Sequence, residues 1–136
     1  MKTAEVIYLG DLRTESRHLK SGNVILTDAP IDNHGKGAAF SPTDLTCTSL
    51  ANCMITTMGI AAQTHSIQMQ EVRAEVLKIM ASEPRRIASI EVDVYMPNHG
   101  YTNKEKTILE HAAHTCPVAK SLHPELIQVI RFHWSE

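Results

Sequence analysis

Hydrophobic and polar positions along the first 28 residues predict strands. Thr3–Leu9 is rich in strand-forming residues, and Leu12–Lys20 follows it after a short polar turn. Residues 21–23, Ser-Gly-Asn, are a tight-turn signal, and Val24–Asp28 then continues as a third short apolar run. The three segments together predict an antiparallel meander.

A loop and then a long helix are expected next. Ala29–Phe40 collects Pro, Asp, Asn and Gly, which favours a loop. Ser41 can cap a helix whose first position suits Pro42, and Asp44 completes an arrangement like a capping box. The helix is expected to end at about Gln63. Its central part has only three polar residues and apolar side chains all round, which is typical of a buried helix.

The middle of the chain predicts a long hairpin. Ile67–Lys78 shows polar alternation, although its composition would also suit a helix. The pairing of Glu71–Glu83 with Arg85–Pro97 favours strands, with a turn at Pro84 and Arg85. In the second of these strands apolar and acidic side chains alternate, which places them on opposite faces: Ile90, Val92 and Val94 against Glu91 and Asp93.

The C-terminal part predicts a second helix and a last strand. Thr102 and Glu105 form a capping box ahead of Lys106–Cys116. Pro117 ends that helix, because proline lacks an N–H and disfavours α conformation at the residue before it. A short turn follows, and Glu125–Trp134 closes the chain as a strand.

The predicted order is therefore βββ-α-ββ-α-β, an α+β fold in which two helices pack on antiparallel sheets. A length of 136 residues suits a single domain, residues 1–136.

Composition narrows the function classes. Hydrophobic residues make up 43%, charged residues 21%, and the net charge is −2, so no basic surface for nucleic acid is expected. The N-terminus lacks the apolar run of a signal peptide, and the most apolar stretch, Leu50–Ala62, is too short to cross a bilayer. We therefore expect a soluble, cytoplasmic protein with no membrane partner.

Three cysteines, Cys47, Cys53 and Cys116, carry the candidate chemistry, and no CxxC pair occurs. Cys47 lies six residues before Cys53, an axial rise of about 9 Å, whereas a disulfide needs Cα atoms within roughly 7 Å. A buried structural thiol is the simplest interpretation of Cys47. Cys53 and Cys116 belong to different helices, so only the tertiary fold can bring them together.

Local sequence favours Cys116 as the more acidic thiol. Pro117 places it at the start of a new helical turn, where unpaired N–H groups favour a thiolate, while Cys53 lies mid-helix and would need a nearby cation.

His111 and His114 share a helical face, but no second ligand pair appears at zinc spacing, so no metal site is predicted. No G-x-S-x-G motif suggests a serine hydrolase.

Two segments together resemble the OsmC/Ohr superfamily, the osmotically inducible and organic hydroperoxide resistance proteins: "GKGAAFSPTDLTCTSLANCMITTMGIAA" and "ILEHAAHTCPVAKSL". The resemblance implies an intertwined homodimer with active sites at the subunit interface and no cofactor. It implies that Cys53 attacks an organic hydroperoxide and that its sulfenic acid condenses with Cys116. A dithiol reductant, of lipoyl type or a low-molecular-weight thiol, would then restore both thiols.

The chain also departs from this family. In the Ohr branch an arginine from the N-terminal strands and a glutamate just after the helix-opening proline form a polar network with the nucleophilic cysteine. Thr43 stands at that glutamate's place, and the acid follows at Asp44, which can also serve only as a helix cap. Arg13 lies nearest the expected arginine position and Arg17 is second, although a surface arginine without a role is an alternative. The alternative function is a non-catalytic OsmC-like dimer that binds a small hydrophobic or thiol ligand in its interface pocket.

Overall fold

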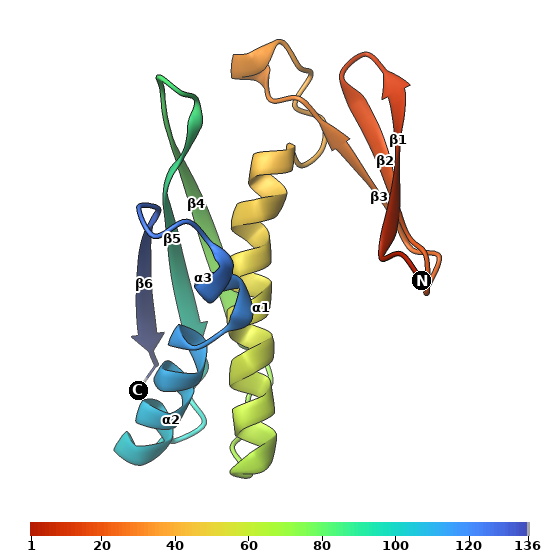
Figure 1. Cartoon of the computed structure of the whole chain (residues 1–136). Coiled ribbons are helices and arrows are strands. Elements are labelled where there is room, and N and C mark those ends of the chain that lie inside the picture. Colours follow the sequence, from red (N-terminus) through yellow and green to blue (C-terminus); the bar gives the residue numbers. More distant parts are fainter. Residues whose placement is uncertain (136) are drawn as a thin grey trace. The chain divides into compact units, whose positions relative to one another are not determined.

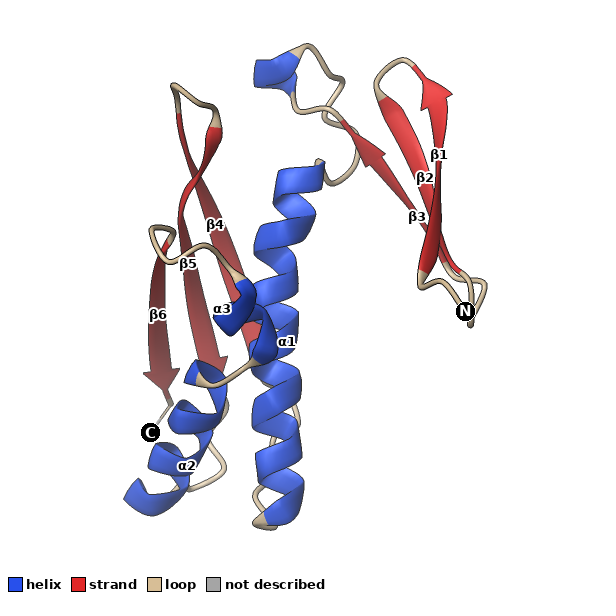
Figure 2. Cartoon of the chain, in the orientation of Figure 1, coloured by secondary structure: helices blue, strands red, loops and turns tan. Residues whose placement is uncertain are grey.

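The computed structural model describes residues 1–135 of the chain, and Figures 1 and 2 show its helices and strands. The chain forms two compact units, Met1–Thr46 and Cys47–Glu136, whose boundary falls in the first turns of the long helix. The interpretation of residues 1–136 as a single domain stays a prediction.

The N-terminal unit is built on the predicted meander. The antiparallel sheet has the order β1-β2-β3, with strands at Ala4–Gly10, Arg13–His18 and Val24–Asp28. The hairpin register pairs Arg17 with Val24 at one end and Arg13 with Asp28 at the other. The three-stranded meander is confirmed, with strand ends within about two residues of those expected.

The loop after β3 folds back closely on the end of that strand. It contains a 3-10 turn, η1, at Ile31–Asn33. A Cβ atom at Gly35 would lie 1.7 Å from the carbonyl oxygen of Ala29, so only glycine fits at this position. The approach is held by backbone hydrogen bonds from Gly35 N to Pro30 O and from Gly37 N to Ala29 O, at 2.9 and 3.2 Å.

The long helix α1 spans Pro42–Thr64 and begins where the sequence predicts. Only one stripe of it is buried in the described chain, formed by Cys47, Leu50, Ala51, Met54, Met58 and Ala62. Ile60 lies off that stripe and is 61% exposed, so the expected burial on most sides of the helix is not observed in the described chain. The helix, with its 23 residues and a hydropathy of 1.3, is long and apolar enough to cross a bilayer, a test that core helices of soluble proteins also pass.

The C-terminal unit contains a second three-stranded sheet, in the order β4-β5-β6. The predicted hairpin is confirmed as the antiparallel pair β4 (Arg73–Ala81) and β5 (Arg86–Met96). Strand β6 (Ile127–Trp134), however, runs parallel to β5, so the expectation of purely antiparallel sheets is wrong for this sheet.

The parallel pairing follows from the connection between β5 and β6. Helices α2 (Asn103–His114) and α3 (Pro117–Ser121) cross from the end of β5 back to its start, so that β6 enters the sheet in the same direction. Parallel neighbours require such a crossover. The sequence predicts a short turn where α3 lies, so this helix is a difference from the expected fold. The α+β class and the predicted order of the other elements hold, with helices covering one face of this sheet (Figure 1).

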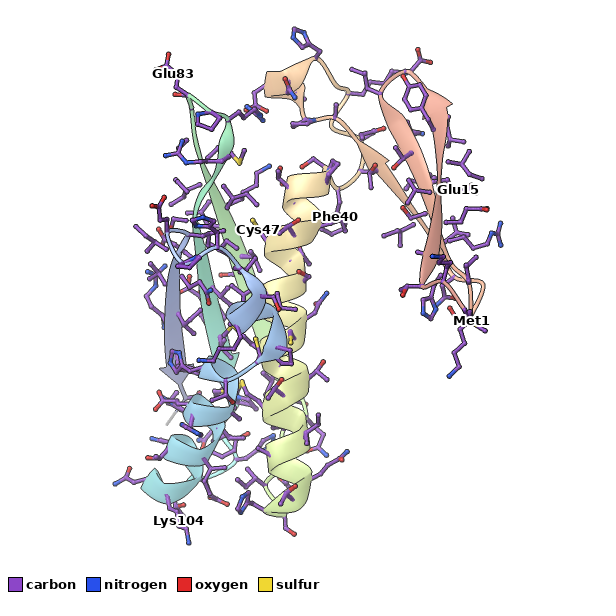
Figure 3. All side chains as sticks on the ribbon, viewed as in Figure 1. Met1, Glu15, Phe40, Cys47, Glu83 and Lys104 are labelled. Carbon is purple, nitrogen blue, oxygen red and sulfur yellow. The ribbon has the colours of Figure 1, made fainter. Side chains whose placement is uncertain are left out.

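The core of this unit lies between α1, α2 and β5. Alternate side chains of β5 are buried at 3% exposure or less, namely Ile90, Val92, Val94 and Met96, as the alternation predicts. They meet the buried stripe of α1 and Leu109 of α2 in one cluster. Figure 3 draws the side chains of the chain and labels Cys47, which belongs to this cluster. The predicted capping box starts α2: Glu105 N donates to Thr102 Oγ1 at 3.1 Å, and Thr102 N donates to Glu105 Oε1 at 2.9 Å.

The opposite face of the sheet carries a charged network centred on Asp93. Arg131, its partner across to β6, donates from Nε to Asp93 Oδ1 at 2.8 Å and from Nη2 to Oδ2 at 3.2 Å. His133 Nε2 lies 2.8 Å from the same Oδ1. Hydrogen bonding from Arg131, and then from His133, lowers the pKa of Asp93 from its ordinary value of 3.8 to about 2.

This lowered pKa predicts how acid acts on the fold. Because the folded-state pKa lies below the unfolded value, the pair stabilises the fold above pH 3.8, and this contribution is lost as the pH falls towards 2. We expect Asp93→Asn to lower the melting temperature by a few degrees at neutral pH and the difference from wild type to close in acid. Thermal melts of both proteins across this pH range measure it; a difference that persists at pH 2 would contradict the assignment.

Candidate functional site

The structure brings Cys53 and Cys116 together inside the C-terminal unit. Cys53 lies half-buried in the middle of α1, and Cys116 is fully buried directly before α3. Their side chains are close enough that Cys53 helps to raise the pKa of Cys116, and both cysteines are free thiols. The encounter that sequence spacing alone left open is therefore present.

The interruption of the helix predicted at Pro117 positions the Cys116 thiol. Helix α2 ends at His114, and Cys116 takes an extended conformation (φ −66°, ψ 145°) as the residue before α3, with Pro117 at the first helical position. The Cys116 sulfur accepts a hydrogen bond from Ala119 N at 3.4 Å. The extended backbone of Cys116, followed by Pro117, thus places the thiol in the core, where Cys53 is its neighbour.

The acidity expected for Cys116 from its place at a helix start is wrong. Burial raises the pKa of this thiol, the hydrogen bond from Ala119 opposes that rise, and the neighbouring Cys53 adds to it. Desolvation outweighs the helix start, since α3 has only five residues and its dipole is small. Cys116 therefore keeps its proton near neutral pH and is poorly suited to attack first.

Cys47 is placed as the sequence suggests. It is 1% exposed and belongs to the core cluster, six residues before Cys53 on the same continuous helix. At about 1.5 Å of rise per residue the two thiols of α1 are separated along the axis by more than a disulfide can span.

Arg13, the predicted activating cation, lies on β2 and is held by Asp28 in a bidentate ion pair. Arg13 Nε donates to Asp28 Oδ1 at 2.7 Å and Nη2 donates to Oδ2 at 2.9 Å. The Asp28 side chain is 3% exposed and that of Arg13 36%. The hydrogen bond from Arg13, together with Ala38 N and the charge of Lys36, lowers the pKa of Asp28, against the opposing effect of burial.

Sequence reasoning missed Asp28. The signal was present in the hairpin register, because the turn at residues 21–23 pairs Arg17 with Val24 and so places Arg13 opposite Asp28. An acidic and a basic residue directly opposite each other on antiparallel strands form a cross-strand pair. Arg13 and Asp28 both belong to the N-terminal unit, and the thiol pair belongs to the other unit.

Asp44 acts as a helix cap. Asp44 N donates to Ser41 Oγ at 3.0 Å, and Asp44 Oδ2 accepts from Ser41 N at 3.0 Å. The capping interpretation is thus confirmed. Along α1, Asp44 precedes Cys53 by nine residues, about 13.5 Å of rise, so this helix does not place the carboxylate beside the thiol of its own chain.

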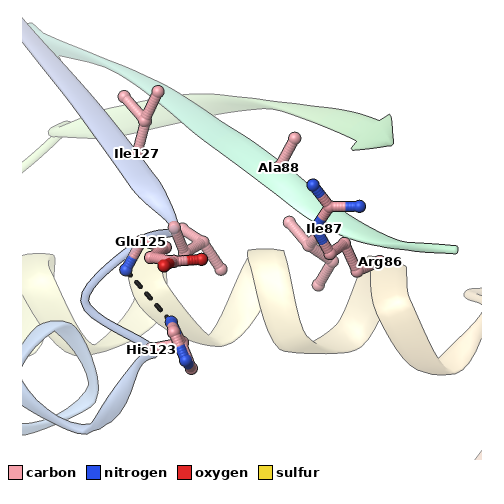
Figure 4. A pocket seen from close by; sticks show the side chains of 7 residues that line it. Arg86, Ile87, Ala88, His123, Glu125 and Ile127 are labelled. Carbon is pink, nitrogen blue, oxygen red and sulfur yellow. Dashed lines mark hydrogen bonds between the residues drawn. The ribbon is translucent and has the colours of Figure 1, made fainter. Parts of the chain in front are cut away.

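A pocket of about 430 Å³ lies between the first residues of β5 and the segment that leads into β6 (Figure 4). The pairing of these two strands begins next to it, at Ser89 and Ile127. Its lining is Arg86, Ile87, Ala88, His123, Glu125, Leu126 and Ile127. His123 Nδ1 accepts a hydrogen bond from Glu125 N at 3.1 Å. None of the predicted site residues lines this pocket. Within residues 1–135, no group of three or more His, Cys, Asp or Glu side chains is arranged to hold a metal ion.

Comparison with known proteins gives the chain a family. A family model described as OsmC-like protein matches residues 34–129, a range that contains Cys47, Cys53 and Cys116. A search of curated proteins found no match. A crystal structure from Psychrobacter arcticus, provisionally described as an osmotic stress induced and detoxification response protein, is 49% identical over 98% of this chain and 96% of that one, with a TM-score of 0.93.

More distant structures share the fold alone. An organic hydroperoxide resistance protein OsmC from Legionella pneumophila is 16% identical, with 97% of each chain covered and a TM-score of 0.74. An organic hydroperoxide resistance protein from Elizabethkingia anophelis is 13% identical, with 99% of this chain and 98% of that chain covered and a TM-score of 0.70. The fold of this chain is thus shared by all three structures.

Proposed function

Because the chain belongs to the OsmC-like protein family, we propose that it is a thiol-dependent peroxidase that reduces organic hydroperoxides. The observation that carries this proposal is the neighbouring pair of free thiols, Cys53 and Cys116. Two adjacent thiols on separate elements of one core are what a peroxide-driven disulfide cycle requires. Structural relatives described as organic hydroperoxide resistance proteins support the same substrate class.

The proposed cycle begins at Cys53. Its thiolate attacks the terminal oxygen of the hydroperoxide, the O–O bond breaks, and the alkoxide leaves and takes a proton to become the alcohol. Cys53 is then a sulfenic acid. The Cys116 sulfur attacks the Cys53 sulfur, which forms the disulfide and releases water. An external dithiol reduces the disulfide by two exchange steps and becomes oxidised itself.

The burial of the two thiols supports this division of roles. Cys53 is half-buried, so a peroxide can reach it, whereas Cys116 is fully buried and has a raised pKa. A protonated and inaccessible thiol suits the second step, in which its partner sulfur is already adjacent. Arg13 would stabilise the thiolate and the leaving alkoxide as a cation. Asp44 contributes by starting the helix that carries Cys53.

The proposal includes a homodimer. The buried apolar residues of the described chain all lie in the C-terminal unit, while the sheet of the N-terminal unit exposes large apolar side chains on both faces: Val6, Ile7, Tyr8, Leu9, Val24, Ile25 and Leu26. A sheet of this kind needs cover that its own unit does not supply. We propose a second copy as that cover, and light scattering should give twice the 15.1 kDa of one chain. A monomeric mass would refute it.

The three cysteines suit a reducing compartment, so we propose a cytoplasmic location and a lipoyl-type or low-molecular-weight thiol reductant.

The function is tested by treating the reduced protein with one equivalent of cumene hydroperoxide and mapping disulfides by mass spectrometry. A Cys53–Cys116 bond and an equivalent of alcohol are the expected products. Reduced cysteines, or oxidation scattered over Cys47 and the methionines, would favour a non-catalytic binding protein instead.

A further inference from the structure

The pocket between β5 and the segment that leads into β6 follows from the parallel pairing of these strands. Strand β5 begins at Arg86, whereas its pairing with β6 begins only at Ser89 and Ile127. Residues 86–88 therefore extend beyond this pairing. The chain that arrives from α3 enters the sheet beside them, and the space between the two is the pocket of about 430 Å³ (Figure 4).

Hydrogen bonds hold the wall of the pocket on the β6 side. Leu126 N donates to His123 O at 2.9 Å, which closes the turn before the strand. Gln128 Nε2 donates to Ala119 O at 3.0 Å and so ties the start of β6 to α3. The pocket is thus formed by the fold before any ligand enters, as is usual for sites that bind small molecules.

On the β5 side, Arg86 presents one edge of its guanidinium to a ligand. Its hydrogen bonds within residues 1–135 both use Nη1, which donates to Ser82 O at 3.1 Å and to Pro84 O at 2.9 Å. The Nε–Nη2 edge is therefore left over, and its two donors match the two oxygens of a carboxylate. His123 adds another donor to the lining, because its Nδ1 accepts from Glu125 N and the proton of the neutral ring is then on Nε2.

Most of the remaining lining is apolar. It consists of Ile87, Ala88, Leu126 and Ile127, and the side chain of Ile127 is 61% exposed. The hydrocarbon part of a ligand would remove this apolar surface from water. Glu125 is the one carboxylate among the described lining residues, and its charge opposes the binding of an anion.

We propose that this pocket binds a small organic carboxylate with an apolar body. The two oxygens of the ligand lie on the Nε–Nη2 edge of Arg86, and its hydrocarbon part covers Ile127. A cationic ligand would instead bind to Glu125 and lie close to the charge of Arg86. The site goes beyond the proposed peroxidase, because neither thiol lines the pocket, and the whole lining belongs to the C-terminal unit.

The test is a titration of the full-length, isotope-labelled protein with hexanoate, followed through the NMR signals of its backbone amides. Signals of the pocket residues should shift with a Kd of about 1 mM, in line with so small a ligand. Hexanol has the same chain without the charge, and hexylammonium has the opposite charge. Both should bind at least about tenfold more weakly than hexanoate, because neither can accept the two hydrogen bonds from Arg86. Equal binding of hexanol, or tighter binding of hexylammonium, would overturn the proposal.

Two neighbouring arginines provide a matched pair of variants. Arg86→Gln should weaken the binding of hexanoate at least about tenfold. Arg85→Gln removes the adjacent charge of the same turn, outside the lining, and should change the Kd by less than about twofold. Glu125→Gln should tighten binding, because it removes the like charge.

Equal weakening in both arginine variants would reduce the effect to general charge attraction and overturn the site. Weaker binding in Glu125→Gln, or shifts that fall outside the pocket, would overturn it as well. Binding needs no turnover, so a protein that fails to consume hydroperoxide would refute the peroxidase and leave this test unaffected.

Discussion

Replacement of Cys53 by serine is expected to reduce hydroperoxide consumption by at least about 10³-fold, equivalent to about 4 kcal/mol of transition-state stabilisation. The sulfur of Cys53 supplies the electron pair that breaks the O–O bond, and a serine hydroxyl, with its far higher pKa and lower polarisability, cannot replace it. The fold should persist, because the side chain is only half-buried and the substitution removes little volume. The measurement is steady-state consumption of cumene hydroperoxide with a dithiol reductant.

Cys47→Ala provides the matched control for this variant. It changes another cysteine of the same helix, in the core and six residues away, so general damage to α1 would appear in both proteins. We expect the control to lose some stability and to keep its turnover. Consumption by Cys53→Ser at the wild-type rate would end the peroxidase proposal.

Cys116→Ser is expected to separate the first chemical step from the second. Cys53 should still consume one equivalent of hydroperoxide, but no disulfide can follow, so the sulfenic acid accumulates and is open to further oxidation. Turnover with a dithiol reductant should fall by at least about tenfold, because the exchange reaction requires a disulfide as its substrate. Stopped-flow measurement of one turnover and steady-state assays together measure the two effects.

A sulfenic-acid probe such as dimedone identifies the expected intermediate. Labelling should appear at Cys53 in Cys116→Ser and remain low in wild type, where the adjacent thiol traps the acid first. Unchanged turnover in Cys116→Ser would show that the thiol pair in the structure is not a working disulfide pair. Labelling of Cys116 in Cys53→Ser would reverse the order of the two thiols.

Much of the fold could be predicted because its signals are local. The capping boxes at Ser41 and Thr102 each depend on hydrogen bonds that span three residues, and both are present. The alternation of Ile90, Val92 and Val94 with acidic residues defines the two faces of β5 from its period alone. The break at Pro117 follows from a missing N–H. The direction of β6 was beyond such signals, since pairing between distant strands leaves no local mark.

The candidate site, like the fold, has features that the sequence predicts and features that only the tertiary structure decides. The sequence by itself determined the two candidate thiols, because Cys116 before Pro117 and Cys53 in an apolar helix can be recognised from short patterns. Only the tertiary structure decided that the two thiols are adjacent, that Asp28 holds Arg13, and that the pKa of Cys116 is raised. The physical reason is that a helix start acts through a few neighbouring N–H groups, whereas desolvation depends on everything packed around the sulfur, from elements far apart in the chain.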